Sequence, residues 1–401
     1  MSDAVIVQAV RAPVGKRGGS LSGIHPVDLH ATVLTELMTR SGVDPAMVDD
    51  HIAGCVSQVG EQSMNQARNA WLAAGLPESV PGVTIDRQCG SSQQAIAFAA
   101  HAIQAGAYDL VVASGVEHMT RVPMGSSREG AEDPTGRRLE ERYGGTLVHQ
   151  GISAELIAHR WSIGREEQDD FGFRSHVRAG EAQRDGRLKT HVLPIDVPAQ
   201  DGTTTTFDRD EGVRADPDRD RMRTLEPAFR DEAYERMFPG QLDWTVTAAN
   251  ASQISDGAAA LLLASGNRAR ELGMPVAATI VAQTVVGDDP IFMLTGPIPA
   301  TEKVLARAGL TLKDIDVVEI NEAFASVVLA WKRELGIDDG WFEDHVNPNG
   351  GAIAIGHPLG ASGARIMCDL LNELERRDGR HGLQVMCEGG GMANATLIER
   401  R

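Results

Sequence analysis

Short apolar segments of strand length alternate along the chain with longer segments in which apolar residues recur at helical spacing. This alternation is typical of an α/β protein built on a parallel sheet. The predicted strands are residues 4–10, 83–86, 109–114, 278–281, 316–320 and 383–387. Directly after Cys89-Gly90, helical spacing resumes at Ile96, Ala99, Ala100 and Ile103. Cys89 is therefore predicted to lie where a buried strand passes into the N-terminus of a helix.

The order of these elements repeats along the chain. In the first half, a glycine turn and a helix precede strand 109–114, and residues 115–119 follow it. In the second half, the glycine-rich segment 356–363 and a helix precede strand 383–387, which leads into three glycines. Two similar α/β halves packed face to face would bring their strand-to-helix turns close together.

Residues 122–250 interrupt this repeat. They are rich in charge, glycine and proline, with a polar helix predicted at 164–183. We expect an insertion that covers the site rather than part of the sheet. Within it, residues 208–223 hold five arginines among six acidic residues, which on charge alone favours a solvated loop with its own ion pairs.

Composition and charge limit the possible functions. The chain has 401 residues, 42% hydrophobic and 23% charged, enough for two or three domains with a sizeable core. No apolar run reaches the roughly 18 residues of a membrane span, and residues 4–10 follow Asp3 rather than a basic segment, so no anchor or secretory signal is expected. The net charge of −18 argues against nucleic acid or an anionic membrane as the main partner.

The four cysteines have none of the paired spacings of zinc or redox motifs, which predicts no metal site and a reducing, cytoplasmic location. An arbitrary free cysteine is most often a small buried side chain. Cys89 differs by its predicted position, because helix N-terminal N–H groups favour a thiolate and Gly90 permits close approach of a substrate. Burial and nucleophilic catalysis both remain open for it.

Three further segments carry candidate chemistry. His357 stands in a glycine-rich turn that matches neither the P-loop nor the dinucleotide fingerprint, so it is either a base or a structural histidine. Cys387 closes a strand before Gly389-Gly390-Gly391, where bare backbone could aim amides at an oxyanion. Asn321 ends another strand, at the edge where α/β sheets bind ligands. Together these residue types suit acyl transfer through a thioester.

The chain resembles the thiolase family, acyl-CoA:acetyl-CoA C-acyltransferases, along nearly its whole length. The motifs that carry the resemblance occur in family order at residues 86–91, 250–252 with 256–259, 321–325, 347–363 and 387–391. The resemblance implies a five-layer αβαβα fold of two similar α/β halves with an inserted loop domain. Its domains would be residues 1–121 plus 251–275 (N-terminal), 122–250 (loop, binding coenzyme A and covering the site) and 276–401 (C-terminal).

The resemblance also implies roles for the candidate residues. Cys89 becomes the nucleophile that is acylated, His357 the base that activates it, and Cys387 the second acid/base. Asn321, through a water, forms one oxyanion hole with His357. The backbone amides of Cys89 and Gly389 form the other.

Contacts to coenzyme A carry over from the same resemblance. Ala248, Ser252, Ala323 and Phe324 match positions that line the pantetheine channel. Arg214 matches a loop-domain arginine near the adenine nucleotide, and His149 occupies the place of a family histidine close to the acyl pocket. Coenzyme A and acyl-CoA would be substrates, with no permanently bound cofactor.

The chain departs from the family pattern in places. Glu388 puts a charge beside Cys387, and an inward orientation would disfavour the Cys387 thiolate. Gln150 stands where biosynthetic members often carry methionine. These variants, with residues 295–299, resemble degradative bacterial thiolases, including those of sterol catabolism.

The expected reaction is thiolytic cleavage of a 3-ketoacyl-CoA by coenzyme A to acetyl-CoA and a shortened acyl-CoA, through an acyl-enzyme on Cys89. The alternatives are a biosynthetic acetoacetyl-CoA thiolase and a catalytically silent acyl-CoA-binding subunit. A decarboxylating condensing enzyme is disfavoured because Cys387 occupies a position that those enzymes fill differently. A homodimer or homotetramer is expected.

Overall fold

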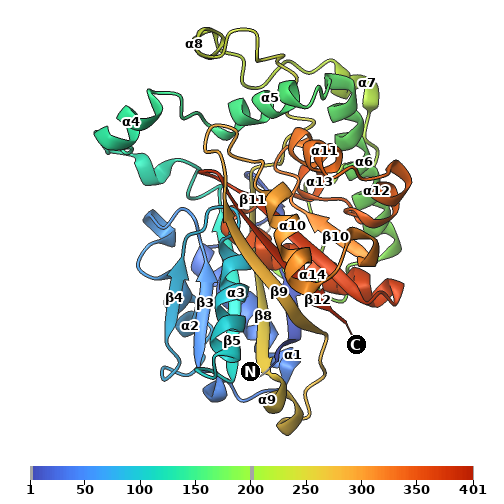
Figure 1. Cartoon of the computed structure of the whole chain (residues 1–401). Helices are drawn as coiled ribbons and strands as arrows, with labels where there is room; N and C mark the ends of the chain where they lie inside the picture. The colour runs from blue at the N-terminus through green and yellow to red at the C-terminus, as the bar shows by residue number, and fades with distance from the viewer. Residues whose placement is uncertain (1–2, 199–202, 401) are drawn as a thin grey trace.

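The computed structural model describes residues 3–198 and 203–400 of the chain (Figure 1). Its main sheet runs in the order β10-β11-β12-β9-β1-β8-β5-β3-β4, with β2 paired to β8. The bounds of these strands are β1 Ala4–Arg11, β2 Gly15–Lys16, β3 Asp50–Gly54, β4 Gly82–Ile85, β5 Leu110–His118, β8 Ser255–Ser265, β9 Ala278–Gly287, β10 Val317–Ile320, β11 His381–Glu388 and β12 Met392–Glu399.

The sheet consists of two parts, one from each half of the chain. Strands β1, β8, β5, β3 and β4 form the N-terminal part, and β10, β11, β12 and β9 form the C-terminal part. They meet at the short pairing of β1 with β9, where Val5 faces Thr279 and Ile6 faces Ala278.

The prediction of a parallel sheet was wrong, because the sheet is mixed. β3 is parallel to β4 and β5, and β10 to β11, whereas β8 is antiparallel to both its neighbours and β12 to both of its own. β12 follows β11 through a tight turn, and a strand that returns directly must run antiparallel. The alternation of apolar segments reports strand positions but not the direction in which each strand re-enters the sheet.

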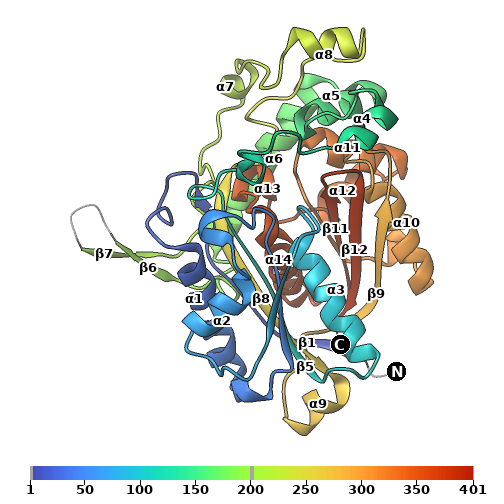
Figure 2. The ribbon, with the colours of Figure 1, turned by 90° about the vertical axis from the view of Figure 1, so that its left-hand side faces the viewer.

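Helices separate the two sheet parts and cover their outer faces, giving the five layers expected (Figure 2). α3 and α14 pack together between the parts; α1 and α2 lie on the N-terminal part, and α10 and α11 on the C-terminal part. The helix bounds are α1 Pro26–Ser41, α2 Gln66–Ala73, α3 Ser91–Gln104, α9 Gly266–Glu271, α10 Pro297–Ala308, α11 Ala325–Glu334, α12 Asp339–His345, α13 Ala352–Ile355 and α14 Ser362–Arg377.

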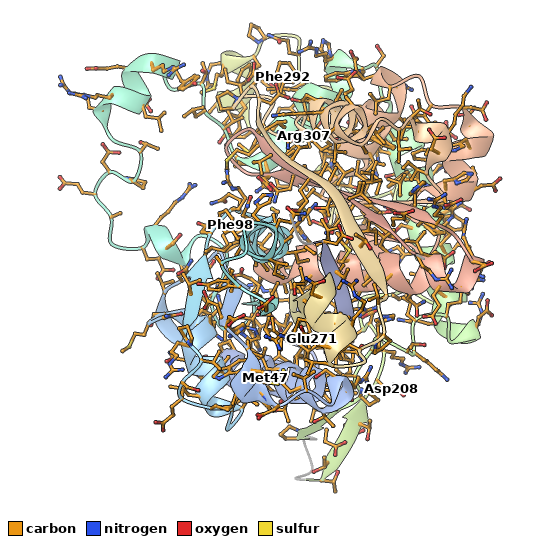
Figure 3. The ribbon with its side chains drawn as sticks, turned by 60° about the horizontal axis from the view of Figure 1, so that its bottom comes forward. Met47, Phe98, Asp208, Glu271, Phe292 and Arg307 are labelled. Carbon is orange, nitrogen blue, oxygen red and sulfur yellow. The ribbon has the colours of Figure 1, made fainter. Side chains whose placement is uncertain are left out.

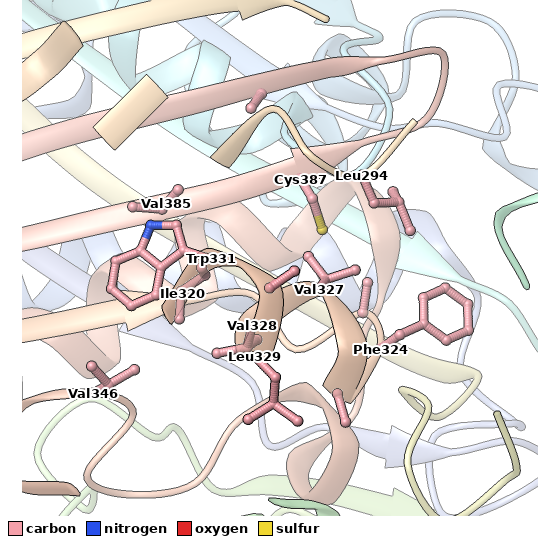
Figure 4. Close-up of a cluster of buried hydrophobic side chains, with 14 of the residues drawn as sticks. Leu294, Ile320, Phe324, Val327, Val328, Leu329, Trp331, Val346, Val385 and Cys387 are labelled. Carbon is pink, nitrogen blue, oxygen red and sulfur yellow. The ribbon is translucent and has the colours of Figure 1, made fainter. Parts of the chain in front are cut away.

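The apolar residues predicted on α3 form the centre of the layered core. Ile96 and Ile103 are fully buried with Leu370 and Leu374 of α14, in one cluster that also contains strand residues of both sheet parts. A second cluster lies between the C-terminal part and α11, around Trp331 and Cys387 (Figure 4). Burial of these side chains positions the N-terminal ends of α3 and α14 against each other.

Strand β4 is less buried than predicted. Val83 is 41% exposed, because β4 is the last strand of the sheet and has a neighbour on one side only. The exposed Met47 and Phe98 also lie on the N-terminal half, and Arg307 of α10 donates to the backbone carbonyl of Gln283 on β9; Met47, Phe98 and Arg307 are labelled in Figure 3.

Residues between β5 and β8 form helices and the strand pair β6 and β7, which projects beside α1 (Figure 2). They are α4 Arg137–Tyr143, α5 Gln150–Arg160, α6 Arg165–Asp185, β6 Ile195–Pro198, β7 Thr204–Phe207, α7 Arg219–Arg223 and α8 Glu232–Met237. The polar helix predicted at 164–183 is confirmed as α6. Arg160 of α5 lies 4.9 Å from the ring centroid of Phe292, in the β9–α10 connection. Across the two described ranges, no helix is long and apolar enough to cross a membrane.

Candidate active site

Cys89 lies between β4 and α3, as predicted. The residue before it, Gln88, has φ +48, a left-handed conformation that is rare for a residue with a side chain. The turn is held by a hydrogen bond from the Ser91 N–H to the Gln88 carbonyl at 3.0 Å and from the Arg87 N–H to the Ser91 hydroxyl at 2.9 Å. Backbone strain of this kind persists where the surroundings enforce it, and here it directs Cys89 into the interior.

At Cys89, burial works against the thiolate that the helix N-terminus favours. Cys89 is 2% exposed, and burial raises its pKa well above the ordinary value; Cys387 and Glu388 add to that effect. The backbone N–H groups of Gly389 and of Cys89 itself point at the sulfur and act in the opposite direction, without overcoming burial. Burial therefore favours the protonated thiol at Cys89.

His357 is held in one tautomer. Its Nδ1 lies 2.6 Å from the hydroxyl of Ser362, and that hydroxyl donates its own proton to the carbonyl of Pro358 at 2.9 Å. Since the hydroxyl has a single proton, Nδ1 must carry the proton of the imidazole and donate. Nε2 is therefore left as a proton acceptor. Burial, assisted by Arg365, lowers the pKa of His357 to about 3, so the ring is neutral.

Glycine is required beside this histidine. Gly356 has φ +115, and a Cβ there would lie 2.3 Å from the hydroxyl of Ser255. The same hydroxyl accepts the His357 backbone N–H at 3.2 Å. The close approach of Ser255, at the start of β8, thus fixes the turn that holds the imidazole.

Asn321 and Cys387 lie next to His357. The Asn321 Nδ2 atom is 3.4 Å from the His357 Nε2 and 3.8 Å from the Cys387 Sγ. Asn321 Oδ1 is buried without a partner among the residues described. Cys387 is fully buried beside Leu294 and Val327 (Figure 4), and burial raises its pKa to about 12. Cys387 is thus a protonated thiol, suited to giving up a proton and taking it back.

The two halves converge at these side chains. Cys89 packs in one buried cluster with Leu359, two residues after His357, and Met386, the residue before Cys387. The structure therefore brings together Cys89, His357, Cys387, Asn321 and Gly389, which the chain supplies from four separate segments. All five residues are buried, and Gly390, the residue after Gly389, is exposed.

Four of the predicted coenzyme A positions form a second group. The Ser252 N–H donates to the Ala323 carbonyl at 2.9 Å, Ala251 pairs with Phe324, and Ala248 is exposed nearby in sequence. The ring centroid of His149, the N-cap of α5, lies 5.3 Å from that of Phe229. The ring centroid of Phe229 lies in turn 6.1 Å from that of Phe324. An aromatic path thus connects His149 to this group.

Arg214 follows Gly212, whose carbonyl accepts a hydrogen bond from the Gln253 side chain at 3.1 Å, next to Ser252. The Arg214 backbone N–H donates to Nδ1 of His176 on α6 at 3.2 Å, and its exposed guanidinium forms no ion pair within the described ranges. Other arginines of the same stretch are paired, Arg219 with Asp170 and Arg223 with Glu166. These two arginines thus pair with carboxylates of α6 rather than with acidic residues of their own stretch, while the Arg214 guanidinium has no ion pair among the described residues.

Two residues that sequence analysis missed support the site. Ser362 orients His357, and its proximity in sequence was the available signal. Glu117, on β5, accepts the N–H of Gly360 at 2.9 Å, in the turn after His357, and those of Val56 and Ser57 at 2.9 and 3.1 Å. No sequence motif indicated Glu117, because three of its hydrogen-bond partners are backbone N–H groups. Residues 3–198 and 203–400 contain no group of three or more His, Cys, Asp or Glu arranged to hold a metal ion.

Comparison with known proteins agrees with this geometry. Residues 4–267 match the family model of the thiolase N-terminal domain, and residues 274–400 that of the C-terminal domain. The whole chain is 48% identical to the steroid 3-ketoacyl-CoA thiolase FadA6 of Mycobacterium tuberculosis, over 95% of that protein, and 42% identical to the full length of a beta-ketoadipyl-CoA thiolase of Escherichia coli. It superposes on the crystal structure of the Bacillus anthracis acetyl-CoA acetyltransferase with a TM-score of 0.88 at 40% identity, covering 100% of this chain and 99% of that one.

The fold and the family models define an acyltransferase. The chain belongs to the thiolase family and is a thiolase. Its substrates are therefore thioesters of coenzyme A.

Proposed function

We propose that this thiolase cleaves a 3-ketoacyl-CoA with coenzyme A, releasing acetyl-CoA and a shortened acyl-CoA through an acyl-enzyme on Cys89. The observation that carries the proposal is that His357 and Cys387 both contact Asn321, while Cys89 packs in one buried cluster with Leu359 and Met386, which lie next to them in the chain. A site of this kind can take and return protons without carrying a net charge.

In the first half-reaction, His357 Nε2 takes the proton of Cys89, and the sulfur attacks the keto carbon of the substrate. The backbone amides of Cys89 and Gly389 stabilise the oxyanion that forms. As the bond between the α- and β-carbons breaks, its electrons pass to the α-carbon, whose thioester oxygen faces Asn321 and His357. Cys387 protonates that carbon, so acetyl-CoA leaves and the acyl group remains on Cys89.

In the second half-reaction, the Cys387 thiolate takes the proton of coenzyme A. The sulfur of coenzyme A attacks the acyl-enzyme, and the imidazolium of His357 returns its proton to Cys89. Each of the three groups thus ends in its starting protonation state. The condensation of two acyl-CoA molecules runs through the same steps in reverse.

Coenzyme A is proposed to reach the site along Ala248, Ser252, Ala323 and Phe324, with its nucleotide phosphates near Arg214 and its acyl partner near His149. The unengaged guanidinium of Arg214 supports this orientation. We propose that coenzyme A is bound only as a substrate, with no permanent cofactor or metal.

We propose degradative rather than biosynthetic work. Two relatives are named for steroid and beta-ketoadipyl substrates, and Gln150 places a carboxamide nitrogen 3.6 Å from where a Cβ of Gly389 would stand. A polar group beside the acyl carbonyl supports a substrate whose acyl chain carries polar groups as well as hydrocarbon. The four free cysteines support a cytoplasmic location.

A homodimer or homotetramer is also proposed. The sheet ends at β4 with Val83 41% exposed, and Phe98 of the neighbouring α3 is 43% exposed. Unpaired edges and exposed apolar side chains are commonly covered in assemblies. Light scattering of the purified chain tests this part, and a monomer at micromolar concentration would refute it.

The main proposal is tested by mixing the protein with coenzyme A and a panel of 3-ketoacyl-CoAs that differ in length, branching and polarity, while following acetyl-CoA. Intact mass without free coenzyme A should show an acyl adduct, which peptide mapping should place on Cys89. Absence of both acetyl-CoA and an adduct across the panel would overturn the proposal.

A further inference from the structure

Glu388 is a buried carboxylic acid beside the site that none of the proposed steps uses. It ends strand β11, directly after Cys387. Successive residues of a strand point to opposite faces, and Met386, two residues earlier, packs with Cys89. Glu388 therefore faces the Cys89 side of the sheet, whereas Cys387 faces α11.

The contact with Gly90 shows how closely the carboxyl approaches the nucleophile. A Cβ built on Gly90 would lie 1.8 Å from Glu388 Oε1 and 2.7 Å from Cδ. Gly90 is the residue after Cys89 and the N-cap of α3. Glycine is thus required at position 90 for the Glu388 side chain to fit, in addition to leaving room for a substrate.

No described residue neutralises this carboxyl. Glu388 is 0% exposed, and neither of its oxygens accepts a hydrogen bond from a described residue. The charged and titratable groups that face it are Arg87 and Asp86 of the loop before α3, Cys89, and Cys387. Arg87 donates to the sulfur of Met392 rather than to Glu388.

The chemistry of the site makes the charge of this group important. Burial raises the pKa of Glu388 to about 8, with Arg87 opposing and Asp86 adding to the shift. Once ionised, Glu388 raises the pKa of both Cys89 and Cys387. It therefore opposes the two thiolates that the reaction needs, and the oxyanion beside Gly389 as well.

We propose that the charge of Glu388 controls the reactivity of the two cysteines. As the uncharged acid, Glu388 permits a thiolate and an oxyanion to form beside it, and as the ionised carboxylate it suppresses both at alkaline pH. The proposal rests on the proposed role of Cys89 as nucleophile. It predicts that the reactivity of Cys89 rises less steeply with pH above about pH 8 than it does when the Glu388 carboxyl is removed.

The test is the rate of Cys89 alkylation by iodoacetamide in the full chain, from about pH 6 to about pH 10, read by peptide mass spectrometry. This readout needs no acyl-CoA, so it separates failure of this inference from failure of the proposed reaction. We expect the wild-type rate to rise clearly less than tenfold per pH unit above about pH 8. The Glu388→Gln variant, equal to wild type near pH 6.5, should be about tenfold faster near pH 9.5.

Two controls complete the experiment. Glu388→Asp keeps an ionisable carboxyl and should keep the wild-type bend. Glu319→Gln removes another buried carboxyl with a raised pKa, on β10, and should leave the profile of wild type unchanged. Superimposable profiles of wild type and Glu388→Gln would overturn the inference. If Glu388→Gln failed to fold, a wild-type rate that rises tenfold per pH unit throughout would do so alone.

Discussion

Each half of the molecule buries a glutamate beside the active site, and the two differ in their surroundings. Glu117, at the end of β5 in the N-terminal half, accepts three backbone N–H groups and the Gln62 side chain at 2.9 Å. Glu388, at the end of β11 in the C-terminal half, accepts none from the described residues. Both are 0% exposed.

The difference shows that burial alone does not decide what a carboxyl does. Burial raises the pKa of both groups, but at Glu117 four hydrogen bonds oppose the shift, and one of them comes from Gly360 in the other half. Glu117 therefore holds the turn of His357 in place. Glu388 lacks such partners, so its protonation state responds to pH close to two reactive sulfurs.

The largest effect is expected from the two cysteines, which likewise come from different halves. Cys89→Ala should lower kcat by about 10⁴-fold or more and abolish the acyl adduct. Cys387→Ala should still accept an acyl group from an acyl-CoA at Cys89, yet fail to break the carbon–carbon bond. Intact mass and acetyl-CoA release measure the two steps separately, and normal turnover by Cys387→Ala would contradict its assigned role.

A smaller loss is expected when the orientation of the base is removed. Ser362→Ala frees Nδ1 of His357, so the neutral ring can adopt the tautomer that blocks proton uptake at Nε2. We expect kcat to fall by about 10²-fold, with KM nearly unchanged. Ser362→Thr, which keeps a hydroxyl, should recover most of the activity. If the alanine variant kept full kcat, the tautomer would have to be held by another group.

The two glutamates should respond oppositely to replacement by glutamine. Glu117→Gln turns an NH2 group toward backbone donors and should lower the free energy of unfolding by about 3 kcal/mol. For Glu388 the folded pKa of about 8 lies above its ordinary value of 4.5. As pH rises from about 4.5 to about 8, this carboxyl ionises in the unfolded chain but stays protonated in the folded protein, so the free energy of unfolding falls. Glu388→Gln should remove that fall in stability.

Urea denaturation at several pH values measures both effects. Near pH 5 the Glu388→Gln variant should resemble wild type, and near pH 8 it should be the more stable protein. A pH-independent difference between them would mean that Glu388 does not titrate in this range. Equal destabilisation by both glutamine variants would show that Glu117 and Glu388 do not differ in their effect on stability.

The smallest effect concerns the exposed Arg214. Arg214→Ala should raise KM for coenzyme A by about fivefold, corresponding to about 1 kcal/mol, and leave kcat unchanged, because a solvated cation on a phosphate contributes little. Arg209→Ala, an exposed arginine of the same stretch, is the matched control and should leave KM unchanged. Equal effects of both substitutions would indicate a general loss of positive charge instead.

Much of the architecture was predictable from local pattern. The strand at 4–10, the helix around Ile96 and Ile103, and the position of Cys89 before that helix all followed from apolar periodicity. The motif at 347–363 indicated His357 through its resemblance to the family, whereas the glycine-rich turn alone left a base and a structural histidine both open. Direction within the sheet did not follow, since β8 and β12 become antiparallel through connections that periodicity does not encode.

By itself, the sequence determined the family and the layered fold and singled out the candidate residues of the reaction, because these depend on residue types at given spacings. Only the tertiary structure decided the ionisation and the hydrogen bonding of these side chains. Burial keeps the pKa of the Cys89 thiol high, and the Glu388 carboxyl faces inward with no hydrogen-bond partner among the described residues, while Glu117 accepts several hydrogen bonds. These properties depend on solvent exclusion and on contacts between residues hundreds of positions apart, which no local spacing can specify.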